Sequence, residues 1–242
     1  MFSKIAIIGT GNVGTWLFQT LKNKNDIEVV AISGRKIETL TPNFDLYIFA
    51  LKDDVYEDIL KQITFKMLYA VHTSGSLSQN ILFPYACKFG VIYPYQSITN
   101  YELQNTNYEV PVCVEGSENV SEDRLFRWVN SVFDIVHKIN EKQRFAMHLA
   151  AVFANNFTNA MYGIAYDIFK ENNLDWSLIL PLLENTLKKV NHQNPKECQT
   201  GPAKRGDISI MEKHSNSLHN NDLKEIYKKL SIIIQQNQSA NH

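Results

Sequence analysis

The sequence predicts an α/β protein in which a doubly wound parallel sheet is followed by an all-helical C-terminal part. Three observations support this prediction. Apolar runs of strand length alternate with helical stretches over the first half of the chain, and a glycine-rich turn directly follows the first run. Strand-like runs cease near residue 121, and helical periodicity continues from there. We therefore expect two domains, residues 1–138 and 139–242.

The first domain is expected to alternate strands with helices. Residues 4–9 (KIAIIG) form a continuous apolar run, which is typical of a strand buried on both faces of a parallel sheet. Val13, Leu17 and Leu21 follow at helical spacing, and a second helix is expected over residues 54–63. The further strands are expected at residues 28–33, 45–51, 67–71, 90–93 and 110–115.

The glycine-rich turn reads Gly-x-Gly-x-x-Gly and lies between the first strand and the first helix, as in Rossmann-like dinucleotide-binding domains. Gly9 would allow the tight turn, Gly11 would let a pyrophosphate approach the backbone, and Gly14 would let the helix pack on the strand. Asn12 and Val13 begin the helix, whose free N–H groups and partial positive charge favour phosphates. The alternative is a plain strand-to-helix turn. The context favours a dinucleotide site.

The end of the second strand indicates which dinucleotide is bound. An NAD site usually carries an acidic residue there, which holds the ribose 2′-hydroxyl. This chain has Ser33-Gly34-Arg35-Lys36 instead, and Ser33 with Arg35 could bind a 2′-phosphate. NADP is therefore favoured over NAD. Alternatively, Arg35 and Lys36 simply begin a solvated helix.

Two further strand ends should meet at the same edge of the sheet, where ligands bind in such folds. Leu51 ends the third strand and Lys52 follows it, and we assign both to the cofactor site. Thr73 and Ser74 follow the fourth strand in the run HTSGS, and we assign their hydroxyls to substrate binding. The alternative for this run is ordinary loop chemistry.

The C-terminal part carries the candidate catalytic residues on its longest helix. The helices of this part are expected at residues 122–133, 141–172, 181–190, 208–218 and 222–236. Helical periodicity aligns His148 and Asn155 with Asn159, Tyr162 and Tyr166 in one polar stripe. Buried polar groups need partners, so the stripe faces a ligand cleft, a partner subunit or another polar helix. We assign His148, Asn155 and Asn156 to catalysis, because imidazole titrates near neutral pH and amides orient carbonyl groups.

The loop TGPAKRGD at residues 200–207 is the last candidate site. Lys204 and Arg205 could hold the carboxylate of a substrate. Asp207 stands where the N-cap of the next helix belongs, so capping plus an ion pair is an equal alternative.

Composition bounds the partners and the compartment. The chain has 242 residues, of which 44% are hydrophobic and 20% charged, and its formal net charge of -1 at pH 7 argues against nucleic acid as a partner. Three distant cysteines, Cys87, Cys113 and Cys198, predict neither disulfides nor a metal site. The chain shows no signal peptide, and the apolar stretch 145–169 holds polar residues that lipid would penalise. We expect a cytoplasmic protein without membrane contact.

Five stretches together resemble a known bacterial family. They are the glycine motif, HTSG at 72–75, YPYQS at 93–97, HLAAVFANN at 148–156 and TGPAKRGD at 200–207. The family joins a Rossmann-like NADP-binding domain to a helical domain of unknown function of the 2520 type. Its members are labelled NADP oxidoreductases, sometimes as dependent on a deazaflavin coenzyme, and are distantly similar to pyrroline-5-carboxylate reductase.

The resemblance implies an NADP-binding fold and a homodimer formed through the helical domain. This chain departs from the family pattern at Tyr93-Pro94, where His-Pro is more common, so an imidazole role does not transfer there. Related β-hydroxyacid dehydrogenases use a lysine and an asparagine on this helix, and the lysine is missing here. The implied activity is hydride transfer between NADP and a small carbonyl or imine substrate that bears a carboxylate. The alternative is a non-catalytic dinucleotide-binding sensor or interaction protein.

Overall fold

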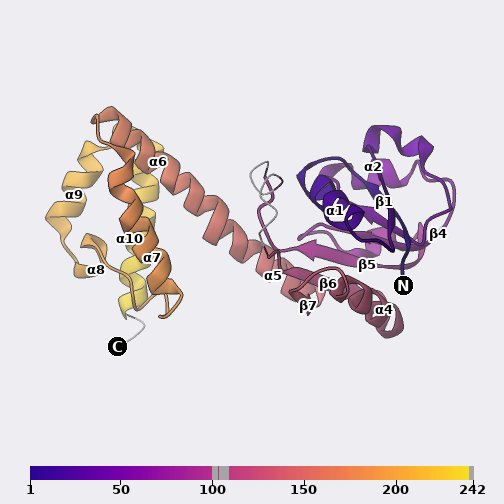
Figure 1. Cartoon of the computed structure of the whole chain (residues 1–242). Coiled ribbons are helices and arrows are strands. Elements are labelled where there is room, and N and C mark those ends of the chain that lie inside the picture. Colours follow the sequence, from indigo (N-terminus) through magenta and orange to yellow (C-terminus); the bar gives the residue numbers. More distant parts are fainter. Residues whose placement is uncertain (100–102, 104–108, 240–242) are drawn as a thin grey trace. The chain divides into compact units, whose positions relative to one another are not determined.

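The computed structural model describes residues 1–99, 103 and 109–239 (Figure 1). Within these ranges, seven strands form a sheet in the order β2-β1-β3-β4-β5-β6-β7. Their bounds are β1 (Lys4–Ile8), β2 (Glu28–Ile32), β3 (Leu46–Phe49), β4 (Met67–His72), β5 (Ala86–Pro94), β6 (Val112–Gly116) and β7 (Val136–Lys138). The predicted α/β class, with a helical C-terminal part, is confirmed.

The sheet is not wholly parallel. Strands β1 to β5 run parallel, whereas β6 runs antiparallel to β5 and β7 parallel to β6. The prediction of a parallel sheet was wrong at β6 because a buried apolar run reads the same in either direction. The expectation that strands cease near residue 121 was also wrong, since β7 follows at Val136–Lys138. Three residues are too few to show a period.

Nine α-helices occur in the described residues. They are α1 (Asn12–Lys22), α2 (Tyr56–Leu60), α4 (Asn119–Asn130), α5 (Glu141–Ala151), α6 (Thr158–Glu171), α7 (Leu180–Val190), α8 (Pro202–Arg205), α9 (Ile208–Ser217) and α10 (Asn221–Ser239). Most of the predicted helices are present with shifted ends. The short α8 lies in the stretch that was predicted as a loop. None of these helices is both apolar enough and long enough to cross a lipid bilayer.

Apolar side chains cover both faces of the sheet. On one face, Leu17 and Leu21 of α1 and Leu125 and Trp128 of α4 pack against strand residues such as Ile7. On the other face, Tyr56 and Leu60 pack against the side chains of β1, β3 and β4. Met147 of α5 packs at a smaller cluster on β5 and β6. This two-sided burial explains why the central strands β1 and β3 are almost wholly apolar.

The predicted long helix over residues 141–172 is present as α5, a π-helical turn (Val152–Phe157) and α6 without a break. Asn140 caps its N-terminus: its side chain accepts a hydrogen bond from the Gln143 N–H at 2.9 Å, and the Gln143 side chain accepts one from the Asn140 N–H at 2.9 Å. This reciprocal capping box satisfies two backbone donors and fixes where the helix begins.

The chain separates into two compact units, Met1–Tyr162 and Gly163–His242. The first contains the whole sheet together with α5, which is anchored to the sheet by hydrogen bonds of Arg144 and Met147. In the second, α8 packs against α9 and α10 (Figure 1). Contacts thus divide the chain within α6, whereas the predicted domain boundary precedes α5. That boundary, between residues 138 and 139, stays a prediction.

Candidate functional site

The glycine-rich turn connects β1 to α1 at the carboxyl edge of the sheet. Gly9 has a φ of +119°, and a Cβ at this position would lie 2.0 Å from the Ala50 carbonyl oxygen. A Cβ on Gly14 would lie 2.0 Å from the Gly9 carbonyl oxygen. Because neither position admits a side chain without a backbone shift, the fold itself requires both glycines.

Gly11 differs from these two glycines, because a Cβ built on it would meet nothing within 4 Å. This residue is the N-cap of α1, and it provides no side-chain cap for the helix. The first turn of α1 carries no acidic residue either. An open Cα beside uncapped N–H groups fits a phosphate, so these residues fit the pyrophosphate of a dinucleotide.

Asn12 and Val13 lie at the start of α1, where their side chains make contacts within the protein. The Asn12 amide nitrogen donates a hydrogen bond to the Ile98 carbonyl at 2.9 Å. Val13 packs against the hydrophobic core. Val13 can therefore offer a ligand only its backbone N–H group, whereas the exposed Asn12 can also offer its side-chain amide oxygen.

The ends of β2 and β3 flank the glycine turn, because both strands pair with β1. Ser33 caps the 3-10 turn Gly34–Thr39 by accepting a hydrogen bond from the Arg35 N–H at 3.4 Å. The Arg35 side chain is exposed, and no ion pair links it to another described residue. Leu51 lies 3.4 Å from where a Cβ on either Gly9 or Gly34 would be, and Lys52 is exposed next to it.

Thr73 and Ser74 form a tight turn at the end of β4, and their hydroxyls are bonded within it. The Thr73 hydroxyl donates to the Phe49 carbonyl at 3.4 Å. The Ser74 hydroxyl accepts from the N–H groups of Ser76 and Leu77 at 3.1 and 3.0 Å. The Ser76 hydroxyl in turn donates to Asp53, which follows β3. These hydroxyls therefore shape the turn, and their predicted contact with substrate stays a prediction.

His148 lies against this turn and against Tyr93 at the end of β5. The Tyr93 hydroxyl and His148 Nδ1 share a hydrogen bond of 3.2 Å. A Cβ on Gly75 would lie 2.6 Å from His148 Nδ1 and 2.9 Å from the Tyr93 ring. His148 Nε2, the other ring nitrogen, makes no hydrogen bond to a described residue. His148 is half-buried, so its free nitrogen suits exchange of a proton with a ligand.

Burial raises the pKa of the Tyr93 hydroxyl to about 12, and the neighbouring Tyr95 acts in the same direction. Tyr93 is therefore a neutral hydrogen-bond donor at physiological pH. When its hydroxyl donates to Nδ1, the neutral His148 ring carries its proton on Nε2.

A buried ion pair lies beneath His148. Arg144, one helical turn before it on α5, is 0% exposed, and its Nε donates to the Glu115 carboxylate of β6 at 3.0 Å. Arg144 Nη1 donates to the Ser74 carbonyl at 3.0 Å. Burial raises the pKa of the Glu115 carboxyl, although the Arg144 guanidinium acts in the opposite direction.

His72 is the last buried polar residue of this group. Its Nδ1 accepts a hydrogen bond from the Ser74 N–H at 3.2 Å, whereas its Nε2 has no partner among the described residues. Burial, together with the charge of Arg144, lowers the pKa of His72 to about 3. The ring is therefore neutral at physiological pH and has a structural rather than an acid-base part in the turn.

Asn155 and Asn156 lie within the π-helical turn, and both are exposed without a side-chain hydrogen bond to the described residues. A π-helical turn holds more residues than an α-helical turn, so it displaces the helical phase of the residues beyond it. The alignment of Asn155 with His148, which assumed a regular α-helix, therefore does not hold unchanged. Their catalytic assignment stays a prediction.

Lys204 and Arg205 belong to the second unit and make local contacts there. Arg205 forms an ion pair with Asp207 at 2.8 Å, and the Lys204 ammonium donates to the Glu197 carbonyl at 3.2 Å. Asp207 is the N-cap residue of α9 but makes no side-chain cap bond. The predicted ion pair of this loop is therefore present, whereas the predicted side-chain cap of α9 by Asp207 is absent. A role in substrate binding stays a prediction.

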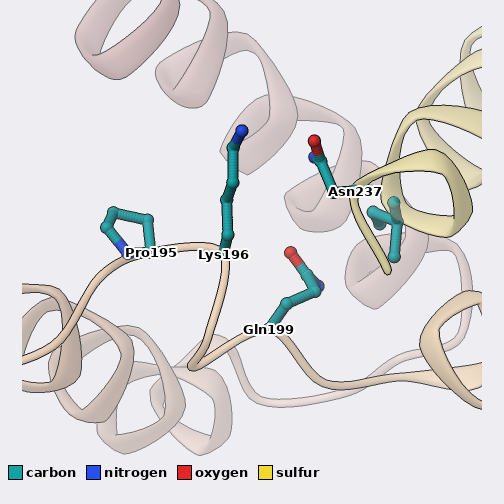
Figure 2. Close-up of a pocket in the computed structure, with 5 residues that line it drawn as sticks. Pro195, Lys196, Gln199 and Asn237 are labelled. Atoms are coloured by element: carbon teal, nitrogen blue, oxygen red, sulfur yellow. The ribbon is translucent and has the colours of Figure 1, made fainter. Parts of the chain in front are cut away.

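Two pockets lie among the described residues of the second unit, and neither is lined by Lys204, Arg205 or Asp207. Figure 2 shows the smaller one, of about 190 Å³, between the loop that carries Pro195, Lys196 and Gln199 and the helix α10 that carries Asn237. The larger one, of about 940 Å³, lies among α6, α9 and α10. Across the described ranges, no group of three or more His, Cys, Asp or Glu side chains could hold a metal ion.

Sequence reasoning missed the buried neighbours of His148. Tyr93 was noted only as a departure from a family pattern, and Glu115 and Arg144 were not singled out at all. One signal was available: Arg144 precedes His148 by four residues, so a charged side chain shares the helix face of the candidate base. Its partner on β6 could not be found, because nothing in the sequence states which strand the helix meets.

Solved structures resemble this chain over its whole length. A Bacteroides fragilis protein described as a "putative NADP oxidoreductase" is 29% identical, with 97% of this chain and 98% of that chain covered and a TM-score of 0.84. A Thermotoga maritima protein is 19% identical over 98% and 99%, with a TM-score of 0.70. The 1-pyrroline-5-carboxylate reductase of Streptococcus pyogenes is 16% identical over 96% and 98%, with a TM-score of 0.54. The last two likenesses concern the fold alone.

No curated protein matches this sequence. A protein family does match it, over residues 110–234, which is just over half of the chain. The matched region begins before β6 and includes α4, the whole long helix and most of the second unit. The resemblance inferred from the sequence motifs is thereby confirmed. This protein belongs to the family described as Domain of unknown function (DUF2520).

Proposed function

We propose that this protein is an NADP-dependent oxidoreductase that transfers a hydride between the nicotinamide and a small carbonyl or imine substrate. The observation that carries the proposal is the open Cα of Gly11 at the uncapped N-terminus of α1, between two glycines that the fold requires. The similarity to the B. fragilis protein, described as an NADP oxidoreductase, supports it.

In this proposal the backbone N–H groups at residues 11–14 bind the pyrophosphate, beside Leu51 and Lys52. Ser33 and Arg35 bind the 2′-phosphate of the adenosine ribose, because an exposed guanidinium without an acidic partner among the described residues attracts a phosphate. The bound cofactor would supply or accept the hydride. NADP is preferred over NAD because the end of β2 carries no carboxylate, which would repel the 2′-phosphate.

His148 is the proposed proton donor in the reducing direction. In the protonated ring, Nδ1–H donates to the Tyr93 oxygen, and the Nε2 proton passes to the oxygen or nitrogen that gains negative charge, which leaves a neutral imidazole. Asn155 or Asn156 orients the carbonyl or imine group, and Thr73 and Ser74 form the adjacent wall. The proposed partner of this site is a small-molecule substrate, and we propose no binding to nucleic acid or to a membrane.

Binding measurements test the cofactor assignment. Calorimetric titration of the full chain should detect NADPH binding that is at least about tenfold tighter than NADH binding, a difference of about 1.4 kcal/mol. Arg35→Ala should abolish this preference by weakening NADPH alone. Lys36→Ala removes a neighbouring exposed cation and is the matched control. If neither nucleotide binds the folded protein, the proposal is wrong.

A screen of imines and keto acids for loss of NADPH absorbance then tests the reaction. On any substrate found, His148→Gln should lower kcat at least about a hundredfold, which is the usual contribution of a general acid. The alternative, a non-catalytic sensor, gains support from the internally bonded hydroxyls of Thr73 and Ser74. Tight NADPH binding without turnover of any compound would favour that alternative.

We further propose that two copies of the chain associate through the helical part. Among the described residues of the second unit, Ala203 is the only buried hydrophobic residue. Large apolar side chains are exposed instead, including Leu182 (62%), Leu187 (63%) and Ile208 (64%). A unit of this size needs a buried core to be stable, and a second copy is the partner that would supply it.

A further inference from the structure

Arg144 joins three separate elements of the first unit. It extends from α5, donates to Glu115 of β6 at 3.0 Å and donates to the Ser74 carbonyl after β4 at 3.0 Å. Arg144 is 0% exposed and Glu115 is 4% exposed. One side chain therefore holds the helix, the sheet and the turn together from within the protein.

Stability does not explain this ion pair. Removing two charges from water is unfavourable, and well-packed apolar residues often serve a fold equally well or better. The neighbouring contacts of α5, such as Met147 on the apolar cluster of Val91 and Tyr93, are of that apolar kind. Arg144 Nη2 also has no partner among the described residues, which adds an unsatisfied buried donor. Burying this ion pair therefore costs desolvation free energy that an apolar contact at the same place would not cost.

The turn and the helix that Arg144 connects meet at His148. Gly75 follows Ser74, and a Cβ on it would lie 2.6 Å from His148 Nδ1. His148 follows Arg144 by one helical turn. The hydrogen bond between Tyr93 and His148, at 3.2 Å, spans the same narrow space. A small shift of either the turn or the helix would change the contact between these two rings.

We propose that Arg144, with Glu115 as its counter-charge, is a positioning residue that sets the hydrogen bond between Tyr93 and His148. It does so by fixing the Ser74–Gly75 turn against α5. This inference rests on the proposed function, in which His148 transfers the proton. Arg144 itself touches neither substrate nor cofactor in this account.

The test removes both charges, so that no single charge is left buried. The double variant Glu115→Leu, Arg144→Met is compared with the wild-type chain, each with and without Tyr93→Phe. The readout is the pair of ¹⁵N chemical shifts of the His148 ring, which report the protonation and hydrogen bonding of each nitrogen. The groups that must be considered are Tyr93, which hydrogen-bonds the ring, and Tyr95, Cys113 and Arg144, which act electrostatically on Tyr93.

In the wild-type background, Tyr93→Phe should shift the Nδ1 resonance of His148. In the double variant, the same substitution should have less than about half that effect, because the hydrogen bond is already perturbed. Glu141→Ala is the matched control: it breaks the exposed hydrogen bond from Ser78 to α5, at 2.8 Å, and should leave the Tyr93 effect intact. An undiminished Tyr93 effect in the folded double variant would overturn the proposal.

Should the double variant not fold, Arg144→Lys answers the same question. Its single ammonium group keeps a positive charge near Glu115 but lacks the fork that reaches Glu115 and Ser74 together. An intermediate loss of the Tyr93 effect is expected, and no loss would contradict the proposal. The NMR readout needs neither cofactor nor substrate, so a failure of the proposed function, seen as absent NADPH binding, is recognised separately. With a substrate in hand, kcat should fall while the Kd for NADPH stays within about twofold.

Discussion

At the scale of single residues, His72 shows how burial rather than residue type decides chemistry. The run HTSGS looks polar and reactive in the sequence, yet His72 is 0% exposed and its Nδ1 accepts the Ser74 N–H. Its pKa of about 3 lies well below the usual value near 6.5, because burial disfavours the charged ring. The histidine that remains accessible for proton transfer is His148, which neighbours the same turn.

His72 predicts a definite dependence of stability on pH. The unfolded chain takes up a proton below about pH 6.5, whereas the folded chain does so only near pH 3, so the stability contributed by neutral His72 is complete above pH 6.5 and is lost as the pH falls. The free energy of unfolding should decline by up to about 1.4 kcal/mol per pH unit in this window from this residue alone.

Denaturant titrations between pH 4 and 7 measure the effect. His72→Asn keeps an acceptor for the Ser74 N–H but cannot take up this proton, so its unfolding free energy should depend less steeply on pH. His137→Asn, at an exposed position of β7, is the control and should match the wild type. Parallel curves for wild type and His72→Asn would refute the assignment.

At the scale of elements, the turn from β1 to α1 contains two kinds of glycine: Gly9 and Gly14, which the fold requires, and Gly11, which it does not. Gly9 and Gly14 are constrained by backbone atoms 2.0 Å from their missing Cβ positions, whereas Gly11 is not constrained at all. Gly11 has a φ of -76°, which any residue adopts. The space beside the Gly11 Cα is therefore available to a ligand.

Alanine substitutions should separate the two kinds of glycine. Gly14→Ala should destabilise the protein by at least about 2 kcal/mol, because its Cβ would overlap a backbone carbonyl. Gly11→Ala should cost less than about 1 kcal/mol of stability but weaken NADPH binding at least about tenfold.

Thermal unfolding and calorimetry on the same samples distinguish these outcomes. Gly163→Ala is a useful reference, since this glycine lies within α6 with nothing within 4 Å of a built Cβ. It should raise the free energy of unfolding by about 0.5–1 kcal/mol, because alanine favours a helix interior over glycine, and should leave NADPH affinity near wild type. A Gly11→Ala chain that binds NADPH with unchanged affinity would show that the pyrophosphate does not approach this Cα.

At the scale of the whole molecule, the two units differ in how much apolar surface they bury. The first unit has extensive clusters on both faces of its sheet. The second has exposed leucines and isoleucines on α7, α9 and α10, with Ala203 as its only buried hydrophobic residue among those described. The proposed second copy would cover this exposed apolar surface.

Sedimentation of the full chain at micromolar concentrations should give the mass of two chains. Leu187→Lys and Ile208→Lys should each shift the equilibrium towards one chain, because a charge would be buried at the interface. Leu68→Lys, at a comparably exposed leucine of β4 (59%), should leave the association unchanged. A wild-type chain that sediments as a folded monomer would exclude the proposed dimer.

Local sequence patterns were enough to predict the fold class, the glycine turn and the long helix. These patterns are continuous apolar runs for buried strands, glycine spacing for the turn, and helical periodicity for the helix. The direction of β6 did not follow, because an apolar run carries no direction. The wider turn at Val152–Phe157 did not follow either, because periodicity assumes a regular helix.

The contacts between side chains could be read only from the folded chain. Tyr93, Glu115, Arg144 and His148 come from separate strands and a helix, and their contacts depend on which face of the sheet α5 covers. Burial decided their chemistry as well, since it is the loss of water that raises the pKa of Tyr93 and lowers that of His72. Local patterns in a sequence record neither distances across a sheet nor access to water, so both had to come from the folded chain.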